Sequence, residues 1–160
     1  MKTISFKNDI SLMEISSPAF AHWKYIPKKY TCDGENINPP FIIHKIPRDA
    51  KSMVLLMDNA SASEKCLTHW LVWNIDPVKQ IEESSVPGIQ GVSDFNIRKY
   101  LGPCQDSGTH VFQFRIFALR KKLTLDPTCG KYQVEKAMTP HILAFGFIAG
   151  FYGRNLKGSE

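Results

Sequence analysis

Short apolar segments separated by turn residues dominate the chain. The segments richest in β-branched and aromatic residues are 42–43, 53–57, 71–75, 111–119 and 142–152. In residues 111–119 four apolar side chains share one face, whereas Gln113 and Arg115 fall on the other. This period of two is typical of an antiparallel strand with one buried face. Short strands between turn signals predict an all-β sandwich or barrel.

Two stretches of the chain depart from this strand pattern. Residues 132–138 are compatible with a helix that Gly130 precedes and Pro140 ends, so we predict one short helix there. Residues 142–152 mix small and bulky side chains. We favour a strand for them, because interior glycines cost a helix about 1 kcal/mol each, and in a strand glycines imply close packing or a bulge. The irregular connection 80–101 is long enough to lie over a site.

Composition indicates one globular domain. The 160 residues, 43% of them hydrophobic, suit a single domain over 1–160 with its core in residues 3–154. No apolar run reaches the roughly 18 residues of a membrane span, so no stable membrane insertion is expected. Residues 1–15 lack the apolar core of a signal peptide, which makes the cytoplasm the expected compartment. The net charge of +5 is scattered without a basic arm or helix, so nucleic acid is not an expected partner.

The four cysteines show no C-x-x-C spacing, so no structural zinc site is expected. In a chain without export signals they are predicted to be reduced and partly buried. The four residues are Cys32, Cys66, Cys104 and Cys129. A reactive thiol remains open only for Cys104, which lies in the loop 102–110.

Candidate chemistry gathers at the ends of the predicted strands. Asp58 follows residues 52–57, His69 opens residues 70–75, and His110 follows a Gly102-Pro103 turn. Two histidines and a carboxylate so placed can converge on one anion-sized site. A neutral histidine offers one donor and a protonated one offers two, while Asp58 attracts an ammonium group and can fix a histidine tautomer. Such a site suits a zwitterion or a phosphate monoester, bound more tightly as histidines protonate near pH 6.5.

Each candidate residue also has a structural interpretation. His69 and His110 can bond backbone groups at strand ends, and Asp58 can bond the N–H groups of the following turn. Asp94 is expected to brace the long connection rather than to touch a ligand. Trp23 and Trp73 are predicted to be core or interface residues.

Several phrases, read in order, carry a resemblance to a known family. They include Tyr30-Thr31-Cys32-Asp33-Gly34, the Thr68-His69-Trp70 strand through Ile75, and the loop from Gly102 to His110. Over residues 3–154 the chain resembles the phosphatidylethanolamine-binding protein family, in its compact bacterial and archaeal branch (Raf-kinase-inhibitor-like, YbhB/YbcL type). The resemblance implies a β-sandwich of two antiparallel sheets, with one or two short helices near the C-terminus.

The resemblance also implies a small pocket for anionic head groups such as phosphate, phosphoethanolamine, acetate or cacodylate. The residues carried over to that pocket are Asp58, His69, Gly102, Pro103 and His110. Cys104 and Phe112 are candidates for further lining of the pocket.

The chain departs from the family pattern around this pocket. The family phrase Asp-Pro-Asp-Ala-Pro is matched here by residues 58–62, which keep the first aspartate but neither proline. The usual Arg-Tyr after the loop histidine is replaced by Val111-Phe112, and Cys104 stands for a loop proline. We therefore expect a less polar site, a looser loop and a changed ligand preference.

These features favour a binding protein for a small anion or phospho-ligand. The alternative is a regulatory interaction protein that recognises a phosphorylated partner, for which the kinase link of the family is only an analogy. A hydrolase that uses the His/Asp pocket is a weaker third possibility, because H-E-x-x-H and G-x-S-x-G motifs are missing from the sequence. No cofactor or metal is expected, and a homodimer through an exposed aromatic face is left open.

Overall fold

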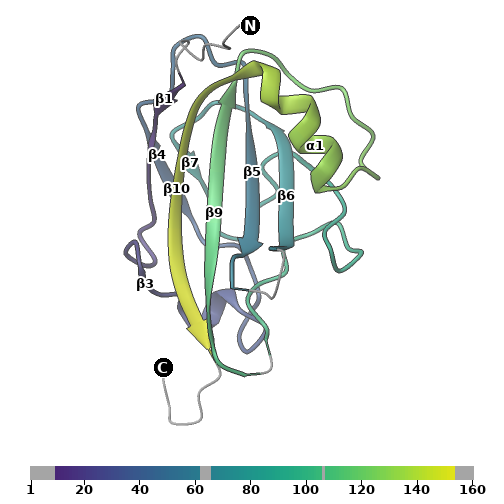
Figure 1. Cartoon of the computed structure of the whole chain (residues 1–160). Coiled ribbons are helices and arrows are strands. Elements are labelled where there is room, and N and C mark those ends of the chain that lie inside the picture. Colours follow the sequence, from purple (N-terminus) through teal and green to yellow (C-terminus); the bar gives the residue numbers. More distant parts are fainter. Residues whose placement is uncertain (1–9, 62–65, 106, 154–160) are drawn as a thin grey trace, which may run out of the picture.

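The computed structural model describes residues 10–61, 66–105 and 107–153, which form two β-sheets. The larger sheet has seven strands in the order β1-β10-β9-β5-β6-β8, and β3 also pairs with β10 (Figure 1). The strand bounds are β1 Ser11–Leu12, β3 Lys24–Tyr25, β5 Ser52–Asn59, β6 Leu67–Ile75, β8 Ile89–Gln90, β9 Thr109–Leu119 and β10 Ile142–Gly153. The five apolar segments of the sequence thus supply β10, β9, β5 and β6 of this sheet and β4 of the other.

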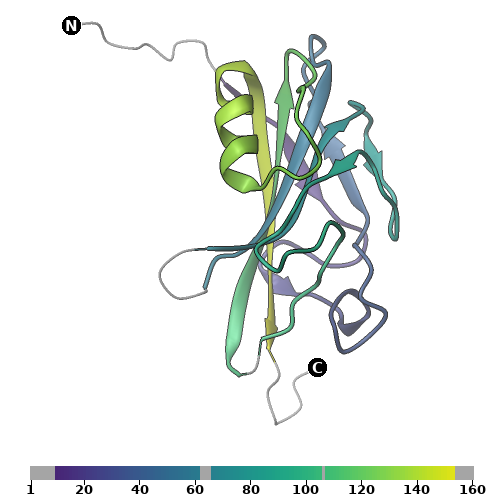
Figure 2. The ribbon, with the colours of Figure 1, turned by 90° about the vertical axis from the view of Figure 1, so that its right-hand side faces the viewer.

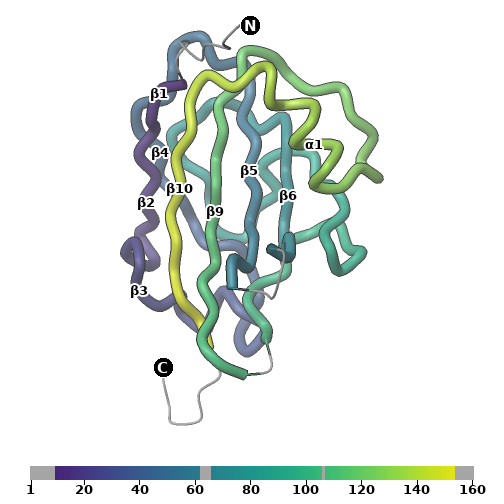
Figure 3. Tube along the Cα trace, viewed as in Figure 1, coloured from purple at the N-terminus to yellow at the C-terminus, as the bar shows by residue number. Residues whose placement is uncertain are grey.

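The smaller sheet covers one face of the larger one and has the order β2-β4-β7 (Figure 2). Its strands are β2 Glu14–Ser16, β4 Phe41–His44 and β7 Gln80–Ile81. The predicted mainly β fold of two sheets is confirmed, with one correction. The expectation of purely antiparallel sheets is wrong for the edge, because β1 and β3 run parallel to β10. The segment from β1 to β3 follows the edge of β10 that β9 leaves free (Figure 3), and it pairs with backbone groups there.

One α-helix lies on the opposite face of the large sheet (Figure 2). Helix α1 (Lys131–Met138) matches the predicted residues to within one position, and the 3-10 turn η2 (Thr139–His141) follows it. At its start the Gly130 N–H donates to Gln133 Oε1 at 2.9 Å, and Pro140 lies in the turn that ends it. A further 3-10 turn, η1 (Lys28–Tyr30), precedes the Cys32 segment. No helix of the described residues is long and apolar enough to cross a membrane.

Alternation along the strands builds two hydrophobic cores. Phe114 and Ile116 of β9 face the core between the sheets, whereas Phe117 and Leu119 face α1. β5 is buried along its whole length, because it is covered on both faces. Trp73 is fully buried, as predicted.

Two of the three glycines of β10 mark close packing against the segment from β1 to Ile26, as the strand interpretation implied. A Cβ atom at Gly146 would lie 2.6 Å from the Met13 carbonyl oxygen, and one at Gly150 would lie 2.7 Å from Ile26 Cγ1. At these two positions Met13 and Ile26 can approach β10 this closely because glycine has no side chain.

The antiparallel pairing also places the candidate site. β5 ends where β6 and β9 begin, because both strands run antiparallel to β5. Polar residues at the end of β5 and at the starts of β6 and β9 therefore meet at one end of the sheet (Figure 1).

Candidate functional site

A cavity of about 340 Å³ lies at this end of the large sheet. Most of its walls are apolar, and four polar side chains project into it. The lining residues are Asn59, Leu67, His69, Phe95, Leu101, Cys104, Gln105 and His110. Two larger hollows, of about 480 and 410 Å³, contain none of the predicted site residues. The predicted histidines therefore meet in this cavity and not in the larger hollows.

His69 is held in one orientation by its neighbours. Its Nδ1 atom lies 2.9 Å from the Leu101 carbonyl oxygen, which can only accept, so Nδ1 carries the proton. Its ring packs edge-on against Phe95 and Phe112, with centroids 4.9 and 5.3 Å away. Burial lowers the pKa of His69 below its ordinary value, and the hydrogen bond to the Leu101 carbonyl opposes this only in part. When His69 is neutral, its Nε2 atom therefore carries no proton and can accept a hydrogen bond from a ligand.

His110 is held in the opposite tautomer. The Ser61 N–H donates to Asn59 Oδ1 at 2.9 Å, which turns the Asn59 amide nitrogen toward His110. That nitrogen lies 2.9 Å from His110 Nδ1 and donates to it. In the neutral ring the proton must then lie on Nε2, so the Nε2 atom of His110 is a hydrogen-bond donor.

Gln105 contributes a second acceptor to the cavity. Its amide nitrogen donates to the Tyr152 carbonyl at 2.6 Å and to the Gly108 carbonyl at 3.1 Å. Its Oε1 atom is buried and has no hydrogen-bond partner among the described residues. A buried acceptor of this kind is costly unless a donor reaches it.

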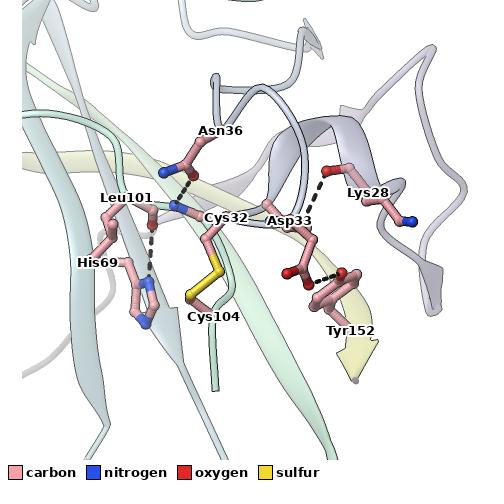
Figure 4. The surroundings of a disulfide bond; sticks show 10 residues. Lys28, Cys32, Asp33, Asn36, His69, Leu101, Cys104 and Tyr152 are labelled. Carbon is pink, nitrogen blue, oxygen red and sulfur yellow. Dashed lines mark hydrogen bonds between the residues drawn. A yellow bond between two sulfur atoms is a disulfide. The ribbon is translucent and has the colours of Figure 1, made fainter. Parts of the chain in front are cut away.

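Gly102 and Pro103 act beneath the cavity and do not line it. The Gly102 N–H donates to Asn36 Oδ1 at 2.8 Å, and the Pro103 carbonyl accepts from the Cys32 N–H at 3.2 Å. Figure 4 shows Leu101 and Cys104 of this loop beside Cys32 and Asn36 of the segment that follows η1. The turn thereby fixes the Leu101 carbonyl that holds His69.

The structure does not bring Asp58 to the cavity, which corrects the sequence prediction. Its carboxylate is 2% exposed and accepts hydrogen bonds from Arg115 at 2.8 Å, Lys131 at 3.3 Å and Thr68 at 3.1 Å. Successive strand residues face opposite sides, so Asp58 points to the α1 face and Asn59 points to the cavity.

The cysteine prediction is also wrong for one pair. Cys32 and Cys104 form a disulfide, with their Cα atoms 5.4 Å apart and a sequence separation of 72 (Figure 4). Only the folded chain brings the two segments together. Cys66 and Cys129 are free thiols, and Cys66 is exposed rather than partly buried.

Other predicted residues have structural roles. Phe112 is fully buried beneath His69 and His110, so it supports the cavity wall without lining it. Asp94 braces the long connection, as expected, by accepting the Thr68 N–H at 2.7 Å. Trp23 is 46% exposed beside β10, which excludes a core role for it.

Sequence reasoning missed several lining residues, namely Asn59, Leu67, Phe95, Leu101 and Gln105. Phe95 and Leu101 lie in the irregular connection 80–101, whose length predicts that it covers a site. Gln105 adjoins Cys104 in the candidate loop, but nothing in the sequence indicates that its amide nitrogen bonds β10.

The geometry defines the class of fold as a β-sandwich with a histidine-lined cavity at one end of its main sheet. Comparison with known families makes the assignment specific, because residues 16–153 match the model of the phosphatidylethanolamine-binding protein family. The chain belongs to this family, which confirms the resemblance found in the sequence.

Relatives and solved structures agree with this assignment. A UPF0098 protein of Pyrococcus abyssi is 38% identical over 154 residues, covering 89% of this chain and 86% of the relative. A UPF0098 protein of Methanothermobacter thermautotrophicus is 39% identical over 150 residues, which cover 89% of this chain and 99% of the relative. The crystal structure of a phosphatidylethanolamine-binding protein homolog from Chlamydia trachomatis superposes with a TM-score of 0.85 at 31% identity, covering 91% and 99%.

A fourth comparison bears on the fold alone. The crystal structure of YbcL from E. coli, described as a member of the mammalian PEBP family, has a TM-score of 0.83 at 20% identity, covering 91% of this chain and all of that one.

Proposed function

We propose that this protein binds a small phosphorylated or carboxylated ligand in the 340 Å³ cavity. The observation that carries the proposal is the pair of fixed histidines, of which neutral His110 donates and neutral His69 accepts through its Nε2 atom. A hydrogen phosphate monoester has both a P–OH donor and P=O acceptors, so it complements His69 Nε2 and His110 Nε2 together. An ammonium group on the ligand, as in O-phosphoethanolamine, would supply the donor that Gln105 Oε1 lacks.

An NMR titration with phosphate and with O-phosphoethanolamine tests this proposal. We expect saturable shifts confined to His69, His110, Gln105 and their neighbours. His110→Ala is expected to weaken binding at least about tenfold, because it removes the donor present at neutral pH.

His44→Ala is the matched control, because His44 is exposed on β4 and lies outside the cavity. It should leave the affinity unchanged. Equal weakening by both substitutions, or no shifts at millimolar ligand, would contradict the proposed site.

The affinity for a divalent anion should rise as the pH falls. Burial lowers the pKa of His69, so the free protein protonates this ring only below its ordinary value. A bound anion favours the protonated ring, so binding takes up a proton and strengthens below about pH 6.5. Sulfate is the best probe, since its own charge stays constant between about pH 7.5 and about pH 5.5. Calorimetric titrations in this interval should show affinity rising at least about threefold.

The same pKa shift predicts the opposite sign for stability of the unliganded protein. Because unfolded His69 binds its proton more readily, its contribution to stability is present above about pH 6.5 and is lost as the pH falls toward its folded pKa.

His69→Gln should abolish the pH dependence of sulfate affinity. An affinity that is flat with pH in the wild type would contradict protonation-linked binding.

A phosphorylated side chain on a protein partner is the second candidate ligand. Phe95 favours a ligand of this kind, because its ring contacts the His69 ring and is 42% exposed. An exposed aromatic ring beside a phosphate site can pack against a peptide. Phosphopeptides that bind more tightly than O-phosphoethanolamine, and lose this advantage in Phe95→Ala, would favour the interaction protein.

A further inference from the structure

We propose that Cys104 is a site of thiol–disulfide exchange, at which a small aliphatic thiol enters the cavity and forms a mixed disulfide. Cys104 is exposed and lines the cavity, whereas Cys32 is half-buried and does not line it. Exchange takes place at the sulfur that a thiolate can reach. A thiol that arrives through the cavity therefore attacks Cys104.

The reaction balances without a further oxidant or reductant. The thiolate attacks Cys104 Sγ and forms a new S–S bond, while the bond between Cys104 and Cys32 breaks. The electron pair of the broken bond leaves on Cys32 Sγ, which takes up a proton from solvent. The products are a mixed disulfide at Cys104 and a free thiol at Cys32.

The surrounding contacts make this exchange reversible. The two segments remain joined by the Cys32 N–H to Pro103 hydrogen bond, by the Gly102 N–H to Asn36 bond and by the Tyr100 hydroxyl, which donates to the Tyr30 carbonyl at 2.8 Å. The 5.4 Å between the Cα atoms lies within the range that a disulfide spans. Cys32 thus stays positioned to attack the mixed disulfide, expel the thiol and restore the original bond.

The modification has a consequence for the ligand. A thiol attached to Cys104 places its body in the cavity that also contains His69 and Gln105. Modified protein should therefore exclude the anionic ligand. This consequence rests on the proposed function, whereas the preference for Cys104 over Cys32 does not.

Peptide mapping distinguishes the two sulfurs. In a Cys66→Ser/Cys129→Ser protein only the disulfide pair remains, and neither substituted residue lines the cavity. The protein is exposed briefly to glutathione, and free thiols are then trapped with iodoacetamide. We expect glutathione on Cys104 at least about tenfold more often than on Cys32, with alkylated Cys32 in the same molecules.

Wild-type protein mapped in the same way controls for any effect of the two serines. The exchange site would be overturned by glutathione found mainly on Cys32 or equally on Cys32 and Cys104. It would also be overturned if all four cysteines of the wild-type protein were free thiols before the reaction.

Saturating O-phosphoethanolamine separates this proposal from the ligand proposal. If both hold, the ligand slows formation of the Cys104 adduct. Loss of the Cys104 preference with intact ligand shifts would overturn the exchange site alone. Loss of the ligand shifts with an intact Cys104 preference would overturn the ligand site alone.

Discussion

Asp58→Asn is expected to lower the free energy of unfolding by about 3 kcal/mol and to leave the ligand affinity of the folded protein within about twofold. Asparagine keeps the shape of the side chain but removes the charge that faces Arg115 and Lys131. Removing one partner of a buried ion pair typically costs 3–5 kcal/mol, because the remaining charge is unpaired. The side chains of Arg115 and Lys131 are 23% and 24% exposed, and Arg115 Nη2 also lies 3.6 Å from Glu135 Oε2, so part of the loss is recovered and the lower end applies.

Urea denaturation together with the NMR titration measures both effects. Asp49→Asn is the control, because Asp49 is exposed and should change stability by less than about 0.5 kcal/mol. An Asp58→Asn protein with unchanged stability and lost binding would return Asp58 to the ligand site that the sequence predicted.

The long strands could be predicted from the sequence, but the short ones could not. The alternation of apolar and polar residues over 112–116 indicates β9, and the flanking Gly130 and Pro140 indicate the bounds of α1. β1, β3, β7 and β8 have two residues each, too few for any period to be read. They are strands only because a neighbouring strand offers free backbone groups at that place.

The candidate site was predictable in its location and less so in its details. His69 and His110 line one cavity, as their positions at strand ends indicated. Which of Asp58 and Asn59 faces that cavity depends on register, and the pairing of β5 with β6 shifts between Met57 and Asp58. Such a shift leaves no mark in the local sequence, because it is set by how the two strands pair.

The disulfide illustrates the same limit over a longer range. Nothing near Cys32 or Cys104 indicates a partner 72 residues away. Their proximity follows from the packing of the Gly102 turn against the segment that follows η1, which is a property of the whole fold. The expectation of reduced cysteines came from the expected compartment, and a stable disulfide is more typical of oxidising compartments. The cytoplasmic location therefore remains a prediction.

Gly102→Ala is expected to destabilise the protein by about 3 kcal/mol, the upper end of what overpacking usually costs. A Cβ atom at this position would overlap the Tyr30 carbonyl oxygen, and it would lie 2.8 Å from Asn36 Oδ1 and 2.9 Å from Thr31 Cα. Two of these atoms are backbone, so no side-chain rotation can relieve the clash. The turn must instead move away from the segment that follows η1.

This movement should also weaken the ligand site, because the Leu101 carbonyl precedes Gly102 directly and holds His69 Nδ1. We expect about tenfold weaker binding of O-phosphoethanolamine under conditions where the variant is still folded, and a displaced His69 resonance. Gly130→Ala is the control, since a Cβ atom there would lie 3.4 Å from its nearest neighbour, the Val92 carbonyl oxygen. Gly130→Ala should lower the free energy of unfolding by about 1 kcal/mol or less, because the change lies at a helix N-cap. The His69 resonance should stay where it is in the wild type. Equal losses in both variants would show that the Gly102 contacts do not position His69.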